Sequence, residues 1–263
     1  EFRRVLFRSR LKLIAAVLLA IGLAVWLCVV KIREELGDEG WGDWRYGVEL
    51  LVTRVKLALQ QRFLGPTHKD ALLTQEELAE SLYFHHKHAK AEKECRDAIA
   101  ACVQTFGPEN DRVFQLRTVL IAALEYQGKA ARAETEFRTL IADRQPTSSP
   151  DDPMLLVDRT NFADFLSGQA RHTEAEEEYR TVLAMEPREP SWESGIFTWA
   201  SCNLALCLER QGKLKQALPL LQRLLADLRK DDPSPNAYYT VAREALERIE
   251  AKLKAEELAE GAK

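Results

Sequence analysis

The sequence predicts an all-α solenoid of stacked helix-turn-helix repeats, preceded by one transmembrane helix. Three observations support this fold class: a repeat spacing of 42 residues, one long apolar stretch, and few glycines and prolines, 12 and 10 among 263 residues. The scarcity of glycine and proline argues against collagen-like, low-complexity and turn-dense all-β proteins. Lysine and arginine number 37 against 41 aspartates and glutamates, so the composition shows no basic footprint for nucleic acid.

The first nine residues, Glu1–Ser9, read EFRRVLFRS and match the translation of a common short-read sequencing adapter. We interpret residues 1–10 as an adapter artefact and exclude them from the fold prediction. A genuine basic leader segment is the alternative.

Leu11–Val30 is the segment that we expect to cross a membrane. It contains one charge, Lys12, near its start, and a helix of this length spans about 30 Å, the thickness of a bilayer's hydrocarbon core. A cleaved signal peptide is disfavoured because no small-x-small cleavage site follows. A lipoprotein attached at Cys28 is disfavoured by the bulky Trp26 and Leu27 before it, and a buried core helix by the length.

Basic residues do not decide the orientation of this span, because Arg10 and Lys12 precede it and Lys31 and Arg33 follow it. A short N-terminal tail usually stays in the cytoplasm. We therefore expect a single-pass protein of the bacterial inner membrane, with residues 31–263 outside the cytoplasm.

Four repeat segments align without gaps and begin at Leu78, Leu120, Phe162 and Leu204. Apolar residues at i, i+3 or i+4 and i+7 predict two amphipathic helices in each. A small residue for close helix packing recurs at Ala91, Ala133, Ala175 and Ala217, and an inner-helix leucine recurs at Leu82, Leu124, Leu166 and Leu208. A single helix-turn-helix hairpin cannot bury the apolar sides of both of its helices, so the repeats must stack.

These residues resemble the tetratricopeptide (TPR) repeat in the 42-residue form of kinesin light chains, which carries a Gly-Pro-Glu linker. That linker stands here as Gly107-Pro108-Glu109, and Gly65-Pro66 lies 42 residues earlier. The resemblance implies a right-handed α-solenoid. The third repeat departs from the pattern, because Ala170 and Arg171 replace Gly-Lys and its linkers lack Gly-Pro-Glu; its junctions could bend differently.

The predicted organisation after the membrane span is a linker, a degenerate half repeat with a helix over Trp44–Leu64, four repeats and a C-terminal capping helix over Ala237–Glu257. Its boundaries are 31–43 for the linker, 44–67 for the half repeat, 68–110, 111–152, 153–191 and 192–232 for TPR repeats 1 to 4, and 233–263 for the cap.

Residues with catalytic or metal-binding chemistry show no recognised spacing, and we predict no enzyme activity, cofactor or metal. The run His85–His88 could offer imidazoles to a transition metal, but neighbouring turn residues point in different directions. We expect it, and the acidic run Glu174–Glu178, to be solvated. The cysteines lack metal-site and disulfide spacing and are expected to fill the core.

The TPR resemblance implies that the first helix of each repeat lines a concave groove. The predicted groove residues are Glu76, Glu80, Tyr83, Phe84, Thr118, Glu125, Tyr126, Asn161, Asp164, Trp199, Asn203, Glu209 and Arg210; we also expect Thr160 and Cys202 on this face. Asn161 and Asn203 match the asparagine with which such repeats grip a peptide backbone, because an amide both donates and accepts hydrogen bonds.

Acidic and aromatic residues dominate this predicted groove. We therefore predict a membrane-anchored, non-catalytic scaffold that binds a basic and apolar segment of a protein or peptide. Two alternatives stay open. The chain could be the C-terminal sensor part of a truncated bacterial membrane serine/threonine kinase, whose domain order it resembles, or an envelope assembly factor.

Overall fold

The computed structural model describes residues 42–185, 194–231 and 237–261, and within these ranges all regular elements are α-helices. The predicted adapter segment, the membrane span and nearly all of the linker lie outside the described residues. Of the helices that the structure describes, none combines the length and the apolar character needed to cross a bilayer. The chain divides between Thr105 and Phe106 into two compact units.

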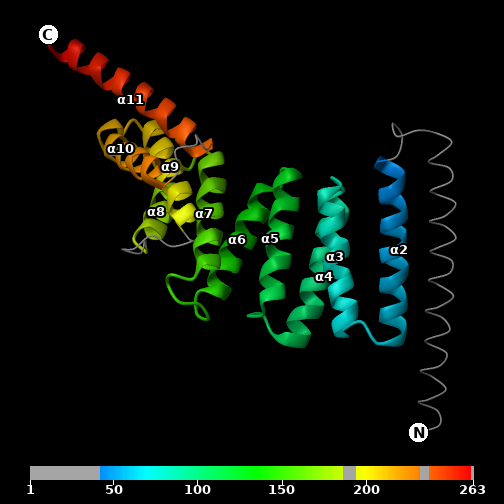
Figure 1. The fold of residues 1–263 in the computed structure, drawn as a ribbon. Helices are drawn as coiled ribbons and strands as arrows, with labels where there is room; N and C mark the ends of the chain where they lie inside the picture. The colour runs from blue at the N-terminus through cyan, green and yellow to red at the C-terminus, as the bar shows by residue number, and fades with distance from the viewer. Residues whose placement is uncertain (1–41, 186–193, 232–236, 262–263) are drawn as a thin grey trace, which may run out of the picture. The chain divides into compact units, whose positions relative to one another are not determined.

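The first unit holds three helices, α2 (Gly42–Phe63), α3 (Lys69–Phe84) and α4 (His88–Phe106), shown in Figure 1. The helix α2 corresponds to the one expected over Trp44–Leu64. It packs on α3, with Tyr46 and Leu57 buried and an ion pair of 3.1 Å between Lys56 Nζ and Glu77 Oε2. The half repeat is therefore part of the folded unit.

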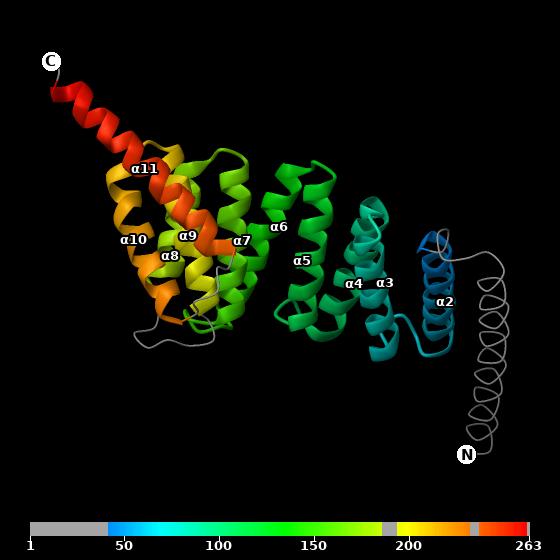
Figure 2. The same ribbon diagram turned by 45° about the horizontal axis from the view of Figure 1, so that its top comes forward.

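The second unit continues as hairpins and ends in a single long helix. Its helices are α5 (Asp111–Tyr126), α6 (Ala130–Arg144), α7 (Pro153–Gly168), α8 (His172–Leu183), α9 (Ser194–Arg210), α10 (Leu214–Asp231) and α11 (Ala237–Gly261). The hairpin partners α5 and α6, α7 and α8, and α9 and α10 pack together, and α7 contacts α9. The last helix, α11, lies against α9 and α10 (Figure 2).

The repeated small residue lies in the core of every repeat. Ala91, Ala133, Ala175 and Ala217 each have 0% exposure, and the residues four positions later, Cys95, Phe137, Tyr179 and Leu221, are buried as well. A side chain of one carbon lets the two helices of a hairpin approach closely. The predicted helix register is therefore confirmed within the described repeats.

The turn between the two helices has the same backbone conformation in all four repeats. His86, Gly128, Ala170 and Gly212 lie 42 residues apart and have φ values of 57°, 69°, 59° and 74°. The residue after each of these donates its backbone N–H to the carbonyl oxygen of the inner-helix leucine. The N···O distance is 3.0 Å from Arg171 to Leu166 and 2.9 Å in the other three repeats. The departure from Gly-Lys in the third repeat thus leaves the turn geometry unchanged, although L-residues other than glycine rarely adopt it.

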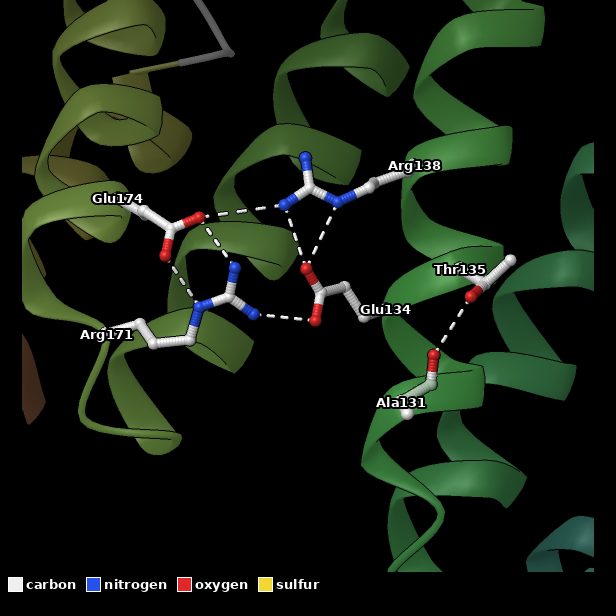
Figure 3. A network of polar contacts seen from close by, with 6 residues as sticks. All are labelled: Ala131, Glu134, Thr135, Arg138, Arg171 and Glu174. Atoms are coloured by element: carbon white, nitrogen blue, oxygen red, sulfur yellow. Dashed lines mark hydrogen bonds and ion pairs between the residues drawn. The ribbon is translucent and has the colours of Figure 1, made fainter.

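Ion pairs join the outer helices of consecutive repeats. Glu134 of α6 accepts a hydrogen bond of 2.6 Å from Arg171, the first residue after the turn of the next repeat, and Arg171 also binds Glu174 (Figure 3). One repeat later, Glu176 accepts one of 2.7 Å from Lys213. Because Glu134 and Glu176, like Arg171 and Lys213, are 42 residues apart, this contact is a repeated one, which we name the junction ion pair.

The prediction that Glu174–Glu178 forms a solvated face is wrong for Glu176 alone, and two of its other glutamates are paired with cations. Glu176 is buried at 8% exposure and paired with Lys213 and Arg180, Glu174 is paired with Arg171, and Glu178 with Arg159. Neighbouring repeats supply cations to this helix, and a single helix pattern does not show them.

A buried ion pair links α6 to α7. Arg144 Nε donates to Asp158 Oδ2 at 2.7 Å, and the guanidinium lies 4.3 Å from the ring centre of Phe114. Burial raises the pKa of Asp158 to about 6 even though Arg144 favours its charged form. This pair fixes a junction whose linker lacks the Gly-Pro-Glu sequence.

Candidate peptide-binding surface

The thirteen predicted groove residues are all half-buried or exposed, and they are distributed over both units. Glu76, Glu80, Tyr83 and Phe84 belong to α3 in the first unit; Thr118, Glu125 and Tyr126 to α5, Asn161 and Asp164 to α7, and Trp199, Asn203, Glu209 and Arg210 to α9 in the second. We name the second set the inner face of the second unit.

Asp164 is the centre of a hydrogen-bond cluster on this inner face. Its Oδ1 accepts a hydrogen bond of 2.7 Å from Asn203 Nδ2 and another from the Tyr179 hydroxyl, and its carboxylate is also bonded to the side chain of Trp199. Burial raises the pKa of Asp164, while these donors lower it in part. Residues from α7, α8 and α9 thus hold one carboxylate in a fixed position.

Asn203 therefore has a role that the sequence did not indicate. One of its amide N–H groups is used inside the protein, so a peptide backbone would meet its carbonyl oxygen and the remaining N–H. Asn161 lies one turn before Asp164 on the same face of α7 and is half-buried. The two asparagines consequently differ in the amide groups that they can offer to a peptide backbone.

Glu125 brings a second acid close to Asp164. Burial of its carboxyl and the charge of Asp164 both raise the pKa of Glu125. Beside it, the ring of Tyr126 is 67% exposed. Thr118, seven positions or two helical turns before Glu125, is exposed and donates its hydroxyl to the Phe114 carbonyl at 3.1 Å. A positive group near Glu125 and Asp164 would relieve the repulsion between them.

Glu209 does not add free negative charge to the inner face, contrary to the prediction. Arg248 and Lys252 of α11 approach its carboxylate to 3.0 and 2.8 Å, and only 10% of its side chain is exposed. Although burial acts to raise it, these donors lower the pKa of Glu209 below its usual range. The adjacent Arg210 is exposed and donates to Ser167 Oγ at 3.2 Å.

Two residues that the sequence analysis placed on the groove belong to the core instead. Thr160 has 0% and Cys202 1% exposure. The described cysteines, Cys95, Cys102, Cys202 and Cys207, are free and buried, as predicted. Burial raises the pKa of Cys95 to about 12 and of Cys202 to about 11, so these thiols stay protonated at neutral pH.

The predicted groove residues of the first unit include an aromatic pair. The rings of Tyr83 and Phe84 lie 5.5 Å apart edge to face, and Phe84 is 71% exposed. His85 and His86 are exposed, as expected for a solvated turn, and in addition the His85 ring stacks on Tyr46 with 3.5 Å between ring centres, while the ring centres of His88 and Tyr83 lie 5.6 Å apart. Among the described residues, no group of three or more histidine, cysteine or acidic side chains is arranged to hold a metal ion.

Solved structures with similar folds include TPR-like repeat proteins. The putative kinesin light chain TPR-like repeats of Podosopora anserina match with a TM-score of 0.61 and 20% identity over 73% of this chain and 93% of that one. BtubC (BKLC) from P. vanneervenii matches with a TM-score of 0.59 and 14% identity, over 83% of this chain and 93% of that one.

The apo form of RapI matches with a TM-score of 0.57 and 9% identity over 78% of each chain. No protein-family model and no curated protein matches the sequence. At these identities the similarity concerns the fold alone. The chain therefore has an all-α, TPR-like helical repeat fold.

Proposed function

We propose that this chain is a membrane-anchored, non-catalytic scaffold that binds a basic and apolar segment of a partner protein on the inner face of its second unit. The observation that carries the proposal is the cluster around Asp164, where three helices hold one carboxylate and Glu125 adds a second. A site built in advance around a negative charge suits a cationic side chain, since little reorganisation is needed on binding.

Aromatic side chains on the same face supply apolar contact area. Tyr126 is largely exposed and Trp199 is half-buried beside Asp164. Tyrosine and tryptophan are enriched among the residues that dominate binding energies, because they bury much area with few rotatable bonds. Their position beside two acids favours a segment in which apolar and basic residues alternate.

The acids that attract such a segment differ from those first predicted. Glu125 and Asp164 remain on the inner face, whereas Glu209 is neutralised by α11. The carbonyl oxygen of Asn203 and the amide of Asn161 are the groups that we assign to the partner's backbone. Glu76 and Glu80 on α3 extend the acidic character of the chain to the first unit.

Membrane attachment is proposed through residues 11–30, on the sequence argument alone. Twenty residues with one charge at the edge fit the thickness of a bilayer. With the repeats outside the cytoplasm of a bacterial inner membrane, the partner would be an envelope protein or peptide.

The proposal is tested with a peptide array and the full chain in lipid nanodiscs. Glu125→Gln should weaken binding of the selected basic peptides up to about fivefold, the range expected for a partly exposed ion pair. Glu177→Gln is the matched control, because Glu177 is an exposed acid on the outer helix α8. A preference for acidic peptides, or equal affinities of the two variants, would contradict the proposal.

A further inference from the structure

We propose that two copies of this chain pair in parallel along α2 when both are anchored in one membrane. The proposal rests on the membrane attachment proposed above. It starts from a second apolar stripe on α2, on the side that does not contact α3.

The first stripe of α2 is used within the unit. Tyr46 and Leu57 are 8% and 6% exposed, and α2 packs on α3. On the opposite side of the helix, Leu51, Val52 and Val55 are 62%, 55% and 42% exposed. A helix that needed only one partner would carry polar residues there.

The second stripe has the spacing of a helix-helix interface. Val48, Leu51, Val55 and Leu59 follow one another at three- and four-residue intervals, and Val48 and Leu59 are half-buried at its ends. In heptad terms Val48 and Val55 fall at a and Leu51 at d. Valine at a with leucine at d favours parallel two-stranded pairing.

Arg62, at the next a position, ends the stripe. From Val48 to Leu59 the stripe is about 17 Å long at ~1.5 Å per residue. So short an interface binds weakly on its own, which explains why it can stay exposed in one copy.

The chain between the predicted membrane span and α2 indicates a second copy as the occupant. The span ends at Val30 and α2 begins at Gly42, so residues 31–41 tether the start of α2 within about 40 Å of the bilayer. Two copies anchored in one membrane leave it in the same direction, which aligns their α2 helices in parallel. Confinement to the membrane also raises their effective concentration, so weak pairing becomes sufficient.

Disulfide cross-linking of the full chain in lipid vesicles tests this pairing. In a Cys28→Ser background, Leu51→Cys should give a covalent dimer on mild oxidation. Glu49→Cys, also exposed on α2 but off the stripe, should stay monomeric. Leu51→Glu with Val55→Glu should reduce the energy transfer between labelled copies to the background level, with the helical circular-dichroism signal retained.

Equal cross-linking of Leu51→Cys and Glu49→Cys, or a monomer in both, would overturn the pairing. So would an internal disulfide between Leu51→Cys and Cys28 in a second sample that keeps the native Cys28, because it would place residues 11–30 of the same chain on α2. Flotation with the vesicles is measured first, because a chain that does not float contradicts the anchor as well. Peptide binding in the same vesicles reports separately on the inner face of the second unit.

Discussion

Ala170 adopts a left-handed backbone conformation that costs an L-residue about 1 kcal/mol or more. The positions equivalent to it in the second and fourth repeats are Gly128 and Gly212, which avoid this cost. The third repeat accepts the strain because its turn makes the same backbone hydrogen bonds as the others.

Ala170→Gly should therefore raise the free energy of unfolding by roughly 0.5–1 kcal/mol, since relief of strain exceeds the added entropy of the unfolded chain. Gly128→Ala is the reverse substitution at the equivalent position and should lower stability by a similar amount. Urea unfolding followed by circular dichroism measures both. A destabilised Ala170→Gly variant would show that the alanine side chain makes a stabilising contact.

Ala133 and Ala175 have no exposed surface, and we assign each to the contact between the two helices of its hairpin, α5 with α6 and α7 with α8. Ala133→Trp and Ala175→Trp should each destabilise the fold by about 1–3 kcal/mol or more, because a bulky ring can enter only if the helices separate. Ala131→Trp is the control, since Ala131 is exposed on the same helix as Ala133. If Ala133→Trp melts at the same temperature as Ala131→Trp, the packing assignment is incorrect.

At the scale of elements, α11 is held by apolar contacts and by one acid. Ala242, Ala245 and Ile249 are fully buried, and Arg248 and Lys252 bind Glu209 of α9. The second half of α11 is mostly polar and exposed, as is typical of a helix that covers the side of a repeat array. Helix α11 thus covers one side of α9 and neutralises the charge of Glu209.

Arg248→Gln with Lys252→Gln should loosen α11, because a nearly buried carboxylate is left without its cations. Limited proteolysis should then cut within α11 faster than in wild type. Arg243→Gln with Lys254→Gln removes the same charge from exposed positions of the same helix and is the control. Equal cleavage rates in the two variants would mean that apolar contacts alone hold α11.

The Glu209 contacts also predict a pH dependence. The pKa of Glu209 is lowered below its ordinary 4.5, so its contribution to stability is fully present above that value. The contribution is lost as the pH falls through the lower folded-state pKa, because the folded protein must then take up a proton. Protection of α11 amides from hydrogen exchange should fall in this window in wild type and change less in Glu209→Gln.

For the chain as a whole, the repeat spacing made the helices and their register predictable. The spacing of apolar residues along each helix predicts which side of that helix is buried, and the 42-residue period aligns Ala91, Ala133, Ala175 and Ala217. The capping helix and the helix of the half repeat followed from the same patterns and from the linker residues.

The candidate site was less predictable, because its properties depend on which side chains of different repeats meet. Nothing in the spacing shows that Asn203 would bond to Asp164, 39 residues earlier, or that Arg248 would cover Glu209. The stacking of His85 on Tyr46 is of the same kind. The 42-residue alignment of Glu134 with Glu176 and of Arg171 with Lys213 was a usable signal for the junction ion pairs, visible once both pairs are compared.

Salt should weaken the proposed partner binding, because it screens charges that are partly exposed. The screening length falls from about 10 Å at 0.1 M to about 3 Å at 1 M. Affinity of the full chain for a basic peptide is measured across this range. An affinity independent of salt would assign the binding to apolar contacts and remove the role given to Glu125 and Asp164.

The junction ion pairs also bear on how a chain of this kind can lengthen. The third repeat contributes a cation to the junction before it, Arg171, and an acid to the junction after it, Glu176. A tandem duplication of one 42-residue period that contains Arg171 and Glu176 would insert one new acid and one new cation in the correct order. The added copy would find a partner at both ends and leave no charge orphaned, so gene duplication could extend the array one repeat at a time without further substitutions at the junctions.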